Sequence, residues 1–212
     1  MNRAFSEWLD LLGTAKVGHM PDPVAGFNFL ALLYRLGAWK SGDFIVDIGS
    51  GNGLYAVPLA TERVRYVGVE PMRECVEFCQ RVFAPYDHLR FMHVDLQNEM
   101  YNPAGRVRPE ELRFPVEDGV ADLVILNSVF THLERMELCR HYLSEVHRVL
   151  CPGGRAWVTW FRHPPNELSA DAGRTVFPEW EIMDALRPFS IRYTAGGLTT
   201  GFHDQWWMVV QK

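Results

Sequence analysis

The sequence has no apolar run long enough to cross a membrane. Its longest largely apolar stretch, residues 27–33, is far shorter than the ~20 residues that a bilayer-spanning helix needs. Glu7 and Asp10 interrupt the first apolar stretch, so nothing at the N-terminus is typical of a secretory signal. We therefore expect neither a membrane protein nor a secreted one, and we predict a cytoplasmic location.

Basic clusters are also absent. The chain has 21 Lys and Arg against 26 Asp and Glu, and its formal net charge at pH 7 is -5. Because a nucleic-acid backbone is normally met by a basic surface, we expect no nucleic acid among the partners. This balance favours a small-molecule substrate, with a specific protein as the alternative, and it does not predict an oligomeric state.

The four cysteines lack the CxxC spacing of a metal or redox motif. Cys75 and Cys79 are one helical turn apart, but no histidine is near them in the sequence, so core packing explains them better than metal binding. We predict no metal site. Four unpaired thiols are typical of a reducing compartment.

The composition suits one folded α/β domain. A chain of 212 residues that is 48% hydrophobic can bury a full core, and it is too short for two comfortable domains. Apolar spacing predicts helices over residues 4–12, 22–36, 72–83, 134–150 and 179–186, with Gly13 and Gly37 as stops for the first two. It predicts strands over residues 44–46, 64–70, 90–94, 120–126, 156–161, 189–194 and 204–211.

A glycine-rich stretch at residues 47–53, Asp-Ile-Gly-Ser-Gly-Asn-Gly, separates the first predicted strand from a helix that starts near residue 54. Glycines at alternate positions let the backbone approach a ligand closely, and the N–H groups of the following helix suit a carboxylate or phosphate. The pattern predicts a nucleotide-type site. A dinucleotide fingerprint would need its third glycine one position later, at Leu54, so a nicotinamide cofactor is the weaker alternative.

An acidic residue also ends each of the next two strands. Glu70 lies 23 positions after Asp47 (70 − 47), close to the interval of roughly 20 residues at which an acid meets ribose hydroxyls in related folds. Its alternative role is a solvated acid before a helix that starts at Pro71. Asp95 and Leu96 follow the third strand. Acids at three successive strand ends are much stronger evidence for a nucleotide-type site than any one of them alone.

The second half of the chain carries a second recognisable junction. Asn127 and Ser128 follow the fourth strand, and residues 148–155, Arg-Val-Leu-Cys-Pro-Gly-Gly-Arg, end a long helix sharply before the fifth strand. With the glycine-rich stretch and the strand-end acids, this junction resembles the class I S-adenosylmethionine-dependent methyltransferases over residues 43–162.

The resemblance implies a Rossmann-like α/β fold with a seven-stranded, mostly parallel sheet in the order 3-2-1-4-5-7-6, an antiparallel last strand and helices on both faces. It implies S-adenosylmethionine as the cofactor and S-adenosylhomocysteine as its product. The residues that it assigns to cofactor binding are Asp47, Gly49, Ser50, Gly51, Asn52, Gly53, Glu70, Pro71, Asp95, Leu96, Asn127 and Ser128. Asp47 would pair with the ammonium, Glu70 with the ribose, and Asp95 and Leu96 with adenine.

We expect a single domain over residues 1–212. Residues 1–40 would form an N-terminal helical cap, residues 43–162 the cofactor-binding core, and residues 163–212 the substrate side. Trp8, His19 and Phe27 would be lid residues or ordinary core and surface residues. Several tryptophans of the C-terminal half would floor an aromatic pocket or belong to the core. Arginines at positions 106, 108 and 113 would meet an anionic group or lie on the surface.

His132 is the candidate catalytic residue. Thr131 and Glu134 fit a capping box that would make His132 the first residue of a helix, where a neutral imidazole, the form a general base needs, is favoured. Its alternative role is a polar surface residue.

The sequence predicts methylation of a small molecule by in-line displacement, with a sugar or secondary-metabolite hydroxyl as the acceptor. The alternatives are N- or C-methylation, methylation of RNA or protein, an NAD(P)-binding oxidoreductase, and a non-catalytic partner subunit that binds the cofactor.

Overall fold

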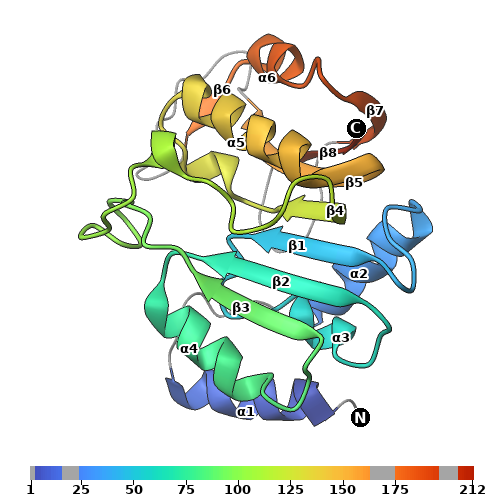
Figure 1. The fold of residues 1–212 in the computed structure, drawn as a ribbon, viewed down its shortest axis with the longest axis vertical. Coiled ribbons are helices and arrows are strands. Elements are labelled where there is room, and N and C mark those ends of the chain that lie inside the picture. The colour runs from blue at the N-terminus through green and yellow to red at the C-terminus, as the bar shows by residue number, and fades with distance from the viewer. Residues whose placement is uncertain (1–2, 16–23, 163–174, 196–204) are drawn as a thin grey trace.

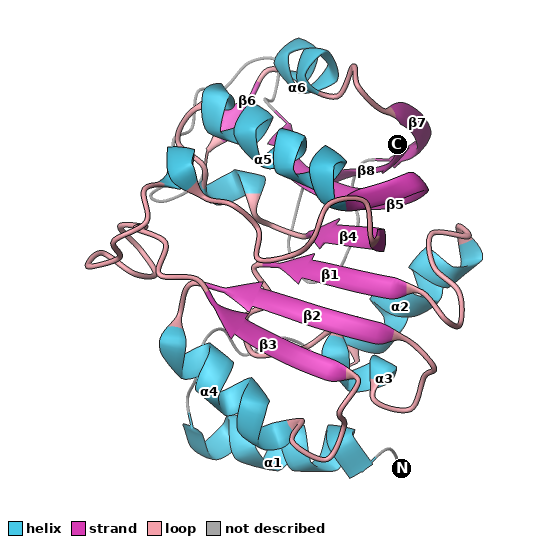
Figure 2. Cartoon of the chain, in the orientation of Figure 1, coloured by secondary structure: helices cyan, strands magenta, loops and turns pink. Residues whose placement is uncertain are grey.

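The computed structural model describes residues 3–15, 24–162, 175–195 and 205–212. A central sheet carries helices on both faces (Figures 1 and 2). The strands are β1 (Phe44–Ile48), β2 (Arg65–Glu70), β3 (Leu89–His93), β4 (Ala121–Leu126), β5 (Leu150–Arg162), β6 (Val176–Phe177), β7 (Ser190–Ala195) and β8 (Gln205–Gln211). The helices are α1 (Arg3–Ala15), α2 (Ala25–Arg35), α3 (Ala56–Leu59), α4 (Arg73–Val82), α5 (Met136–Val149) and α6 (Glu179–Ala185), with 3-10 turns η1 (Pro109–Glu111) and η2 (Phe130–His132).

The sheet order is β3-β2-β1-β4-β5-β8-β7, which confirms the predicted topology. β1 to β5 pair in parallel, and β8 runs antiparallel to both of its neighbours, β5 and β7. One strand was not predicted. The two-residue β6 pairs in parallel with Phe161 and Arg162 of β5, and it is too short to show an apolar alternation in the sequence.

Two buried clusters fill the two faces of the sheet, because alternate residues of a strand point to opposite sides. Val46 and Val124 pack with α5 and α6 on one face. Ile45, Leu123 and Trp157 pack with α1, α2, α3 and α4 on the other. The predicted apolar stripes of α4 and α5 are both buried, so helical spacing identified the core correctly.

Several predicted helix ends were wrong by a few residues. α1 continues past Gly13 to Ala15, since a single glycine only weakens a helix. α2 ends at Arg35, close to the predicted stop at Gly37, whose φ is +63°. The predicted start of α2 at residues 22–23 lies outside the described residues. The helix after the glycine-rich stretch is the four-residue α3, which begins only at Ala56 because the chain first turns through residues 54–55.

The arrowheads of β1 to β4 point the same way, so the carboxyl ends of these strands form one edge of the sheet (Figure 1). The glycine-rich stretch, the long β3–β4 connection and the β4–η2 connection all leave the sheet at this edge. The fold therefore gathers the predicted site residues at one edge, as expected for parallel strands in an α/β protein.

Candidate active site

The turn after β1 depends on its glycines. Gly49, Gly51 and Gly53 have φ values of +74°, +53° and +82°, which side chains with a Cβ rarely adopt. A Cβ at Gly53 would lie 2.8 Å from the ring of Phe83 and 3.0 Å from the sulfur of Cys79, so this position has no room for one. A Cβ at Gly51 would meet nothing within 4 Å, so the loop is open on that side.

Asp47 is 1% exposed, and the hydroxyl of Tyr66 donates a 2.7 Å hydrogen bond to its Oδ2. Burial raises the pKa of Asp47 to about 7, the Tyr66 hydrogen bond opposes that rise, and the charge of Glu70 adds to it. No cationic side chain among the described residues contributes to this pKa. A buried carboxylate without a positive partner is unfavourable, and a ligand ammonium would supply that partner.

Glu70 connects β2 to the glycine loop. Its Oε2 accepts a 2.9 Å hydrogen bond from the N–H of Gly51, and its Oε1 accepts a 3.0 Å bond from the N–H of Met72. Burial raises the pKa of Glu70, while these two N–H groups lower it. Pro71 lies between Glu70 and Met72 in the chain, and its carbonyl is 3.1 Å from Nε2 of His93. Each carboxylate oxygen keeps a second lone pair with which it can accept from a hydroxyl.

Asp95 lies two residues beyond β3, but its carboxylate contacts its own loop. The Nε of Arg106 lies 2.7 Å from one oxygen and Nδ2 of Asn102 lies 3.1 Å from the other, and these hydrogen bonds lower the pKa of Asp95. The N–H of Leu96 donates to the carbonyl of Val94 at 2.7 Å. Both groups that would meet adenine already have partners within the chain.

The arginines considered for an anionic substrate form ion pairs with neighbouring acids. Besides the Arg106–Asp95 pair, Arg108 pairs with Glu111, and Arg113 lies 3.2 Å from Asp118. These contacts favour the surface role that the sequence left open for them.

Asn127 is held from two sides. The indole N–H of Trp157 donates to its Oδ1 at 3.1 Å, and its Nδ2 donates to the hydroxyl of Tyr55 at 2.7 Å. Burial raises the pKa of Tyr55, and the charge of Asp47 adds to this effect. Tyr55 therefore lies between the glycine loop and the end of β4. Sequence reasoning missed it because its partner is 72 residues away.

His132 does not begin a helix, so the predicted capping box was wrong. Thr131 donates its hydroxyl to the carbonyl of Ser128 at 2.7 Å, which closes the turn η2, and α5 begins only at Met136. The argument for a neutral imidazole at a helix N-terminus fails with it.

The structure supplies a different environment for His132. Its Nε2 lies 3.0 Å from the hydroxyl of Tyr101, and the two rings meet edge to face at 5.1 Å. Burial raises the pKa of Tyr101, and the charge of Glu70 contributes to this rise. Tyr101 belongs to the β3–β4 connection, where the sequence showed no pattern.

Trp8 of α1 supports the glycine loop, although it lies outside residues 43–162. Its indole N–H donates a 2.8 Å hydrogen bond to the carbonyl of Asn52, and its side chain is buried. Trp8 is therefore a core residue that touches the loop. Phe27 packs edge to face on Phe5 at 5.5 Å, and His19 lies outside the described residues.

Ser50 has a buried hydroxyl with no hydrogen-bond partner among the described residues. It packs against Gly68 of β2, where a Cβ would come within 2.7 Å of the Ser50 oxygen. The predicted loop residues thus surround a turn whose polar groups are only partly satisfied within the chain.

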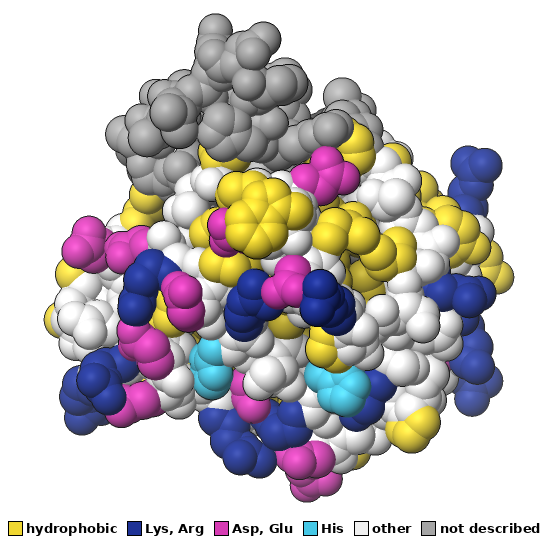
Figure 3. Space-filling model, turned by 90° about the horizontal axis from the view of Figure 1, so that it is seen from above, with side chains coloured by type: hydrophobic (Ala, Val, Ile, Leu, Met, Phe, Trp, Pro, Cys, Tyr) yellow, Lys and Arg dark blue, Asp and Glu magenta, His cyan; other side chains and the backbone are white. Residues whose placement is uncertain are grey.

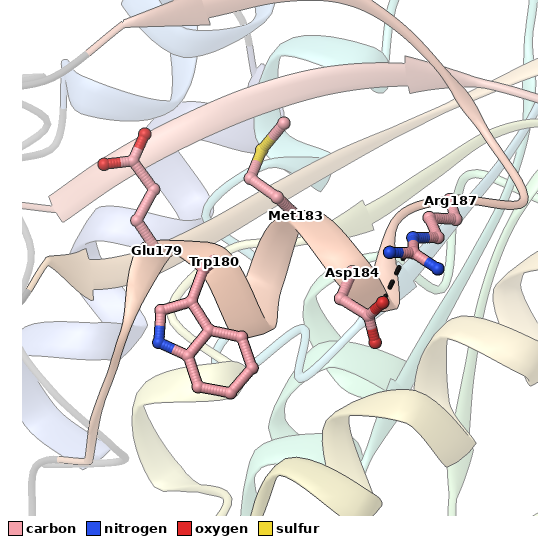
Figure 4. Close-up of a pocket in the computed structure, with 5 residues that line it drawn as sticks. All are labelled: Glu179, Trp180, Met183, Asp184 and Arg187. Atoms are coloured by element: carbon pink, nitrogen blue, oxygen red, sulfur yellow. Dashed lines mark ion pairs between the residues drawn. The ribbon is translucent and has the colours of Figure 1, made fainter.

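A surface hollow lies elsewhere, on α6. It measures about 580 Å³ and is lined by Glu179, Trp180, Met183, Asp184 and Arg187 of α6 and the turn after it (Figure 4). None of these is a predicted site residue. Trp180 is exposed, whereas Trp157, Trp160 and Trp207 are buried in the core, so the tryptophans do not form one pocket.

Within the described part of the chain, no cluster of three or more His, Cys, Asp or Glu could hold a metal ion. No described helix is long and apolar enough to cross a membrane.

A family model described as a methyltransferase domain matches residues 46–158. Among solved structures, the chain is similar to a SAM-dependent methyltransferase from Aquifex aeolicus, with 17% identity, 98% and 97% of the two chains covered and a TM-score of 0.63. It is similar to magnesium protoporphyrin IX methyltransferase from Synechocystis PCC 6803 with bound SAH (18%, 98% and 94%, TM-score 0.66). It is also similar to 1,6-didemethyltoxoflavin-N1-methyltransferase from Burkholderia thailandensis with bound S-adenosylhomocysteine (19%, 98% and 84%, TM-score 0.63).

Proposed function

Because this chain belongs to the methyltransferase domain family, we propose that it uses S-adenosylmethionine as its cofactor and methylates a hydroxyl oxygen of a small molecule, such as a sugar or a secondary metabolite. The observation that carries the proposal is the hydrogen bond between Tyr101, in the β3–β4 connection, and His132, in the turn η2 that follows β4. A hydroxyl must lose its proton as it is methylated, and an imidazole at this place can accept it through the Tyr101 hydroxyl.

Bound S-adenosylmethionine supplies a methyl group on a sulfonium, which is already a good leaving group. The protein then has to align the acceptor oxygen with the methyl group and take up its proton. Correct orientation alone contributes up to roughly 7 to 11 kcal/mol in favourable cases. In this proposal the Tyr101 hydroxyl gives its proton to Nε2 of His132, with which it is hydrogen-bonded, and takes up the proton of the acceptor.

The cofactor contacts follow from the carboxylates. Asp47 would pair with the ammonium of the methionine part, which is the positive charge that its buried carboxylate lacks. Glu70 would accept from the ribose hydroxyls with its remaining lone pairs. Asp95 would accept from the adenine amine with the lone pairs that Arg106 and Asn102 leave on its carboxylate, and the N–H of Leu96 would exchange the carbonyl of Val94 for an adenine nitrogen.

The groups around the end of β4 support a neutral acceptor. The side chains that hydrogen-bond there, on Tyr55, Asn127, Ser128, Thr159 and Gln205, are all uncharged. The acceptor would therefore be recognised by hydrogen bonds, as a hydroxyl is.

The charged surface supports a small molecule over a nucleic acid. On the face shown in Figure 3, Lys and Arg side chains stand among acidic ones and do not form a continuous basic surface. Among the described residues, Arg135 pairs with Glu110 and Arg140 with Asp184. Two similar methyltransferases are named for small molecules, magnesium protoporphyrin IX and 1,6-didemethyltoxoflavin. The second is an N1-methyltransferase, so a nitrogen acceptor is the alternative for this chain.

We further propose that residues 1–212 act as one domain in the cytoplasm. In this arrangement residues 1–40 cap the cofactor side, residues 43–162 hold the cofactor, and residues 163–212 contribute to the acceptor side.

The proposal is tested by incubating the protein with S-adenosylmethionine and a panel of small hydroxylated acceptors, and measuring formation of S-adenosylhomocysteine. His132→Gln should lower kcat by about 10²- to 10⁴-fold with an oxygen acceptor and leave the Kd for S-adenosylhomocysteine within about twofold of wild type. His88→Gln is the matched control. His88 lies just before β3, where its ring contacts the carbonyl of Leu59, and it is not one of the proposed site residues. Methylation of RNA or a polypeptide, with no turnover of any small acceptor, would overturn the proposal.

A further inference from the structure

Ser128 has an unusual backbone conformation for its residue type. Its φ is +62°, and it is the one non-glycine residue with a positive φ in the described part of the chain. A residue with a Cβ is disfavoured in this region, and it stays there only when its surroundings hold it. Ser128 directly follows Asn127 and lies four residues before His132.

Three side chains from three different elements hold Ser128. Thr159 of β5 accepts from the Ser128 N–H at 2.7 Å, and Thr131 of η2 donates to its carbonyl at 2.7 Å. Gln205 of β8 donates from Nε2 to the Ser128 hydroxyl at 2.9 Å. Every polar group of Ser128 therefore has a partner, and all three partners are buried. We call Thr131, Thr159 and Gln205 the Ser128 clamp.

The clamp acts on a segment that lies against the cofactor loop. A Cβ at Gly49 would come within 3.1 Å of Cγ2 of Val129, so the residue after Ser128 packs directly on the glycine loop. Asn127, on the other side of Ser128, is tied to Tyr55 and Trp157. A shift of Ser128 would therefore move η2, including His132, relative to the glycine loop.

We propose that Thr159 and Gln205 are positioning residues for methyl transfer. They hold Ser128 in its disfavoured conformation and so fix residues 127–132 at the distance from the glycine loop that in-line transfer requires. A displacement of about 1 Å at a reacting group can lower a rate about 10²-fold, so a device of this kind has a large effect without touching the substrate. The inference deepens the proposed function and rests on it only for the role of His132.

The test compares two variants of one residue. Thr159→Val keeps the shape of the side chain and removes the oxygen that accepts from Ser128, whereas Thr159→Ser keeps the oxygen. Thr159→Val should lower kcat about 10- to 100-fold, with the Kd for S-adenosylhomocysteine within about twofold of wild type, and Thr159→Ser should restore most of the rate. Adding Ser128→Gly to Thr159→Val should recover part of kcat, because glycine adopts a positive φ without strain.

A second readout does not depend on the acceptor. By NMR, the Ser128 amide hydrogen should exchange at least tenfold faster in Thr159→Val than in wild type or in Thr159→Ser. Unchanged exchange, or a loss of kcat matched by an equal loss of cofactor affinity, would overturn the proposal. If His132→Gln has normal kcat while Thr159→Val is impaired, the base assignment is wrong and the clamp stands.

Discussion

Replacing Asp47 with asparagine should make the protein more stable at pH 8 while weakening its affinity for the cofactor. The carboxyl of Asp47 is fully buried, and its pKa is raised from 3.8 to about 7 by burial. An amide has nearly the same shape and can still accept from Tyr66, but it does not ionise. The variant therefore removes a charge that is unfavourable for the fold and that we propose is required by the ligand.

The sign and the size follow from proton linkage. Between pH 3.8 and about 7 the folded protein keeps the Asp47 proton and the unfolded chain has lost it, so the stability contributed by this group falls as pH rises and is constant above about pH 7. A pKa raised from 3.8 to about 7 corresponds to at most about 4 kcal/mol of unfolding free energy. Asp47→Asn should match wild type near pH 4 and gain up to this amount at pH 8.

Urea unfolding of both proteins at pH 5 and pH 8, with and without S-adenosylhomocysteine, measures this difference. Without ligand the advantage of the variant should grow with pH. With saturating ligand it should shrink or reverse, because an ammonium beside the carboxylate stabilises its charged form. Asp43→Asn is the matched control. Asp43 is also buried with a raised pKa, but it precedes β1 and accepts from the N–H of Lys40.

Two results would refute this reasoning. One is a loss of stability in Asp47→Asn that does not depend on pH. The other is cofactor affinity that falls equally in the Asp47 and Asp43 variants, since then the charge of Asp47 would have no special relation to the ligand.

Two further predictions concern the glycine loop. Glu70→Gln should weaken binding of S-adenosylhomocysteine by about 1 to 3 kcal/mol, measured by calorimetry, because an amide nitrogen would replace one of the two oxygens that accept from the N–H groups of Gly51 and Met72, and that nitrogen cannot accept from the ribose. Unchanged affinity would contradict the assignment. Trp8→Phe should raise the same Kd several-fold by leaving the carbonyl of Asn52 without its indole donor. Trp39→Phe, which loses an equivalent bond to the carbonyl of Leu30, should leave the Kd unchanged, and equal effects in both variants would contradict a specific role for Trp8.

The positions of the strands could be predicted from the sequence because their signals are local, whereas the strand order followed from the family resemblance. Apolar periodicity identified the long elements, and the acids at positions 47, 70 and 95 marked three strand ends that parallel pairing brings to one edge. The glycine loop was equally visible, since its φ values need glycine itself. These features are encoded within a few residues of where they act.

The contacts that complete the site have no local signal. Trp8 reaches Asn52 across 44 residues, and Tyr101 reaches His132 across 31. Asp95 is paired with Arg106 of its own loop, which no periodicity indicates. The capping-box prediction failed for a related reason. The hydroxyl of Thr131 had a nearer partner in the carbonyl of Ser128, so a tight turn formed where a helix was expected.

The hydrogen bond between Trp8 and Asn52 limits how far the protein can be truncated from its N-terminus. The family model matches the chain from residue 46 onward. The glycine loop within this region is also supported by α1, which ends 31 residues earlier (46 − 15). A fragment trimmed to that region would expose the side chains of α3 and α4 on which α1 rests. We expect the smallest piece able to recognise the cofactor to include the first helix.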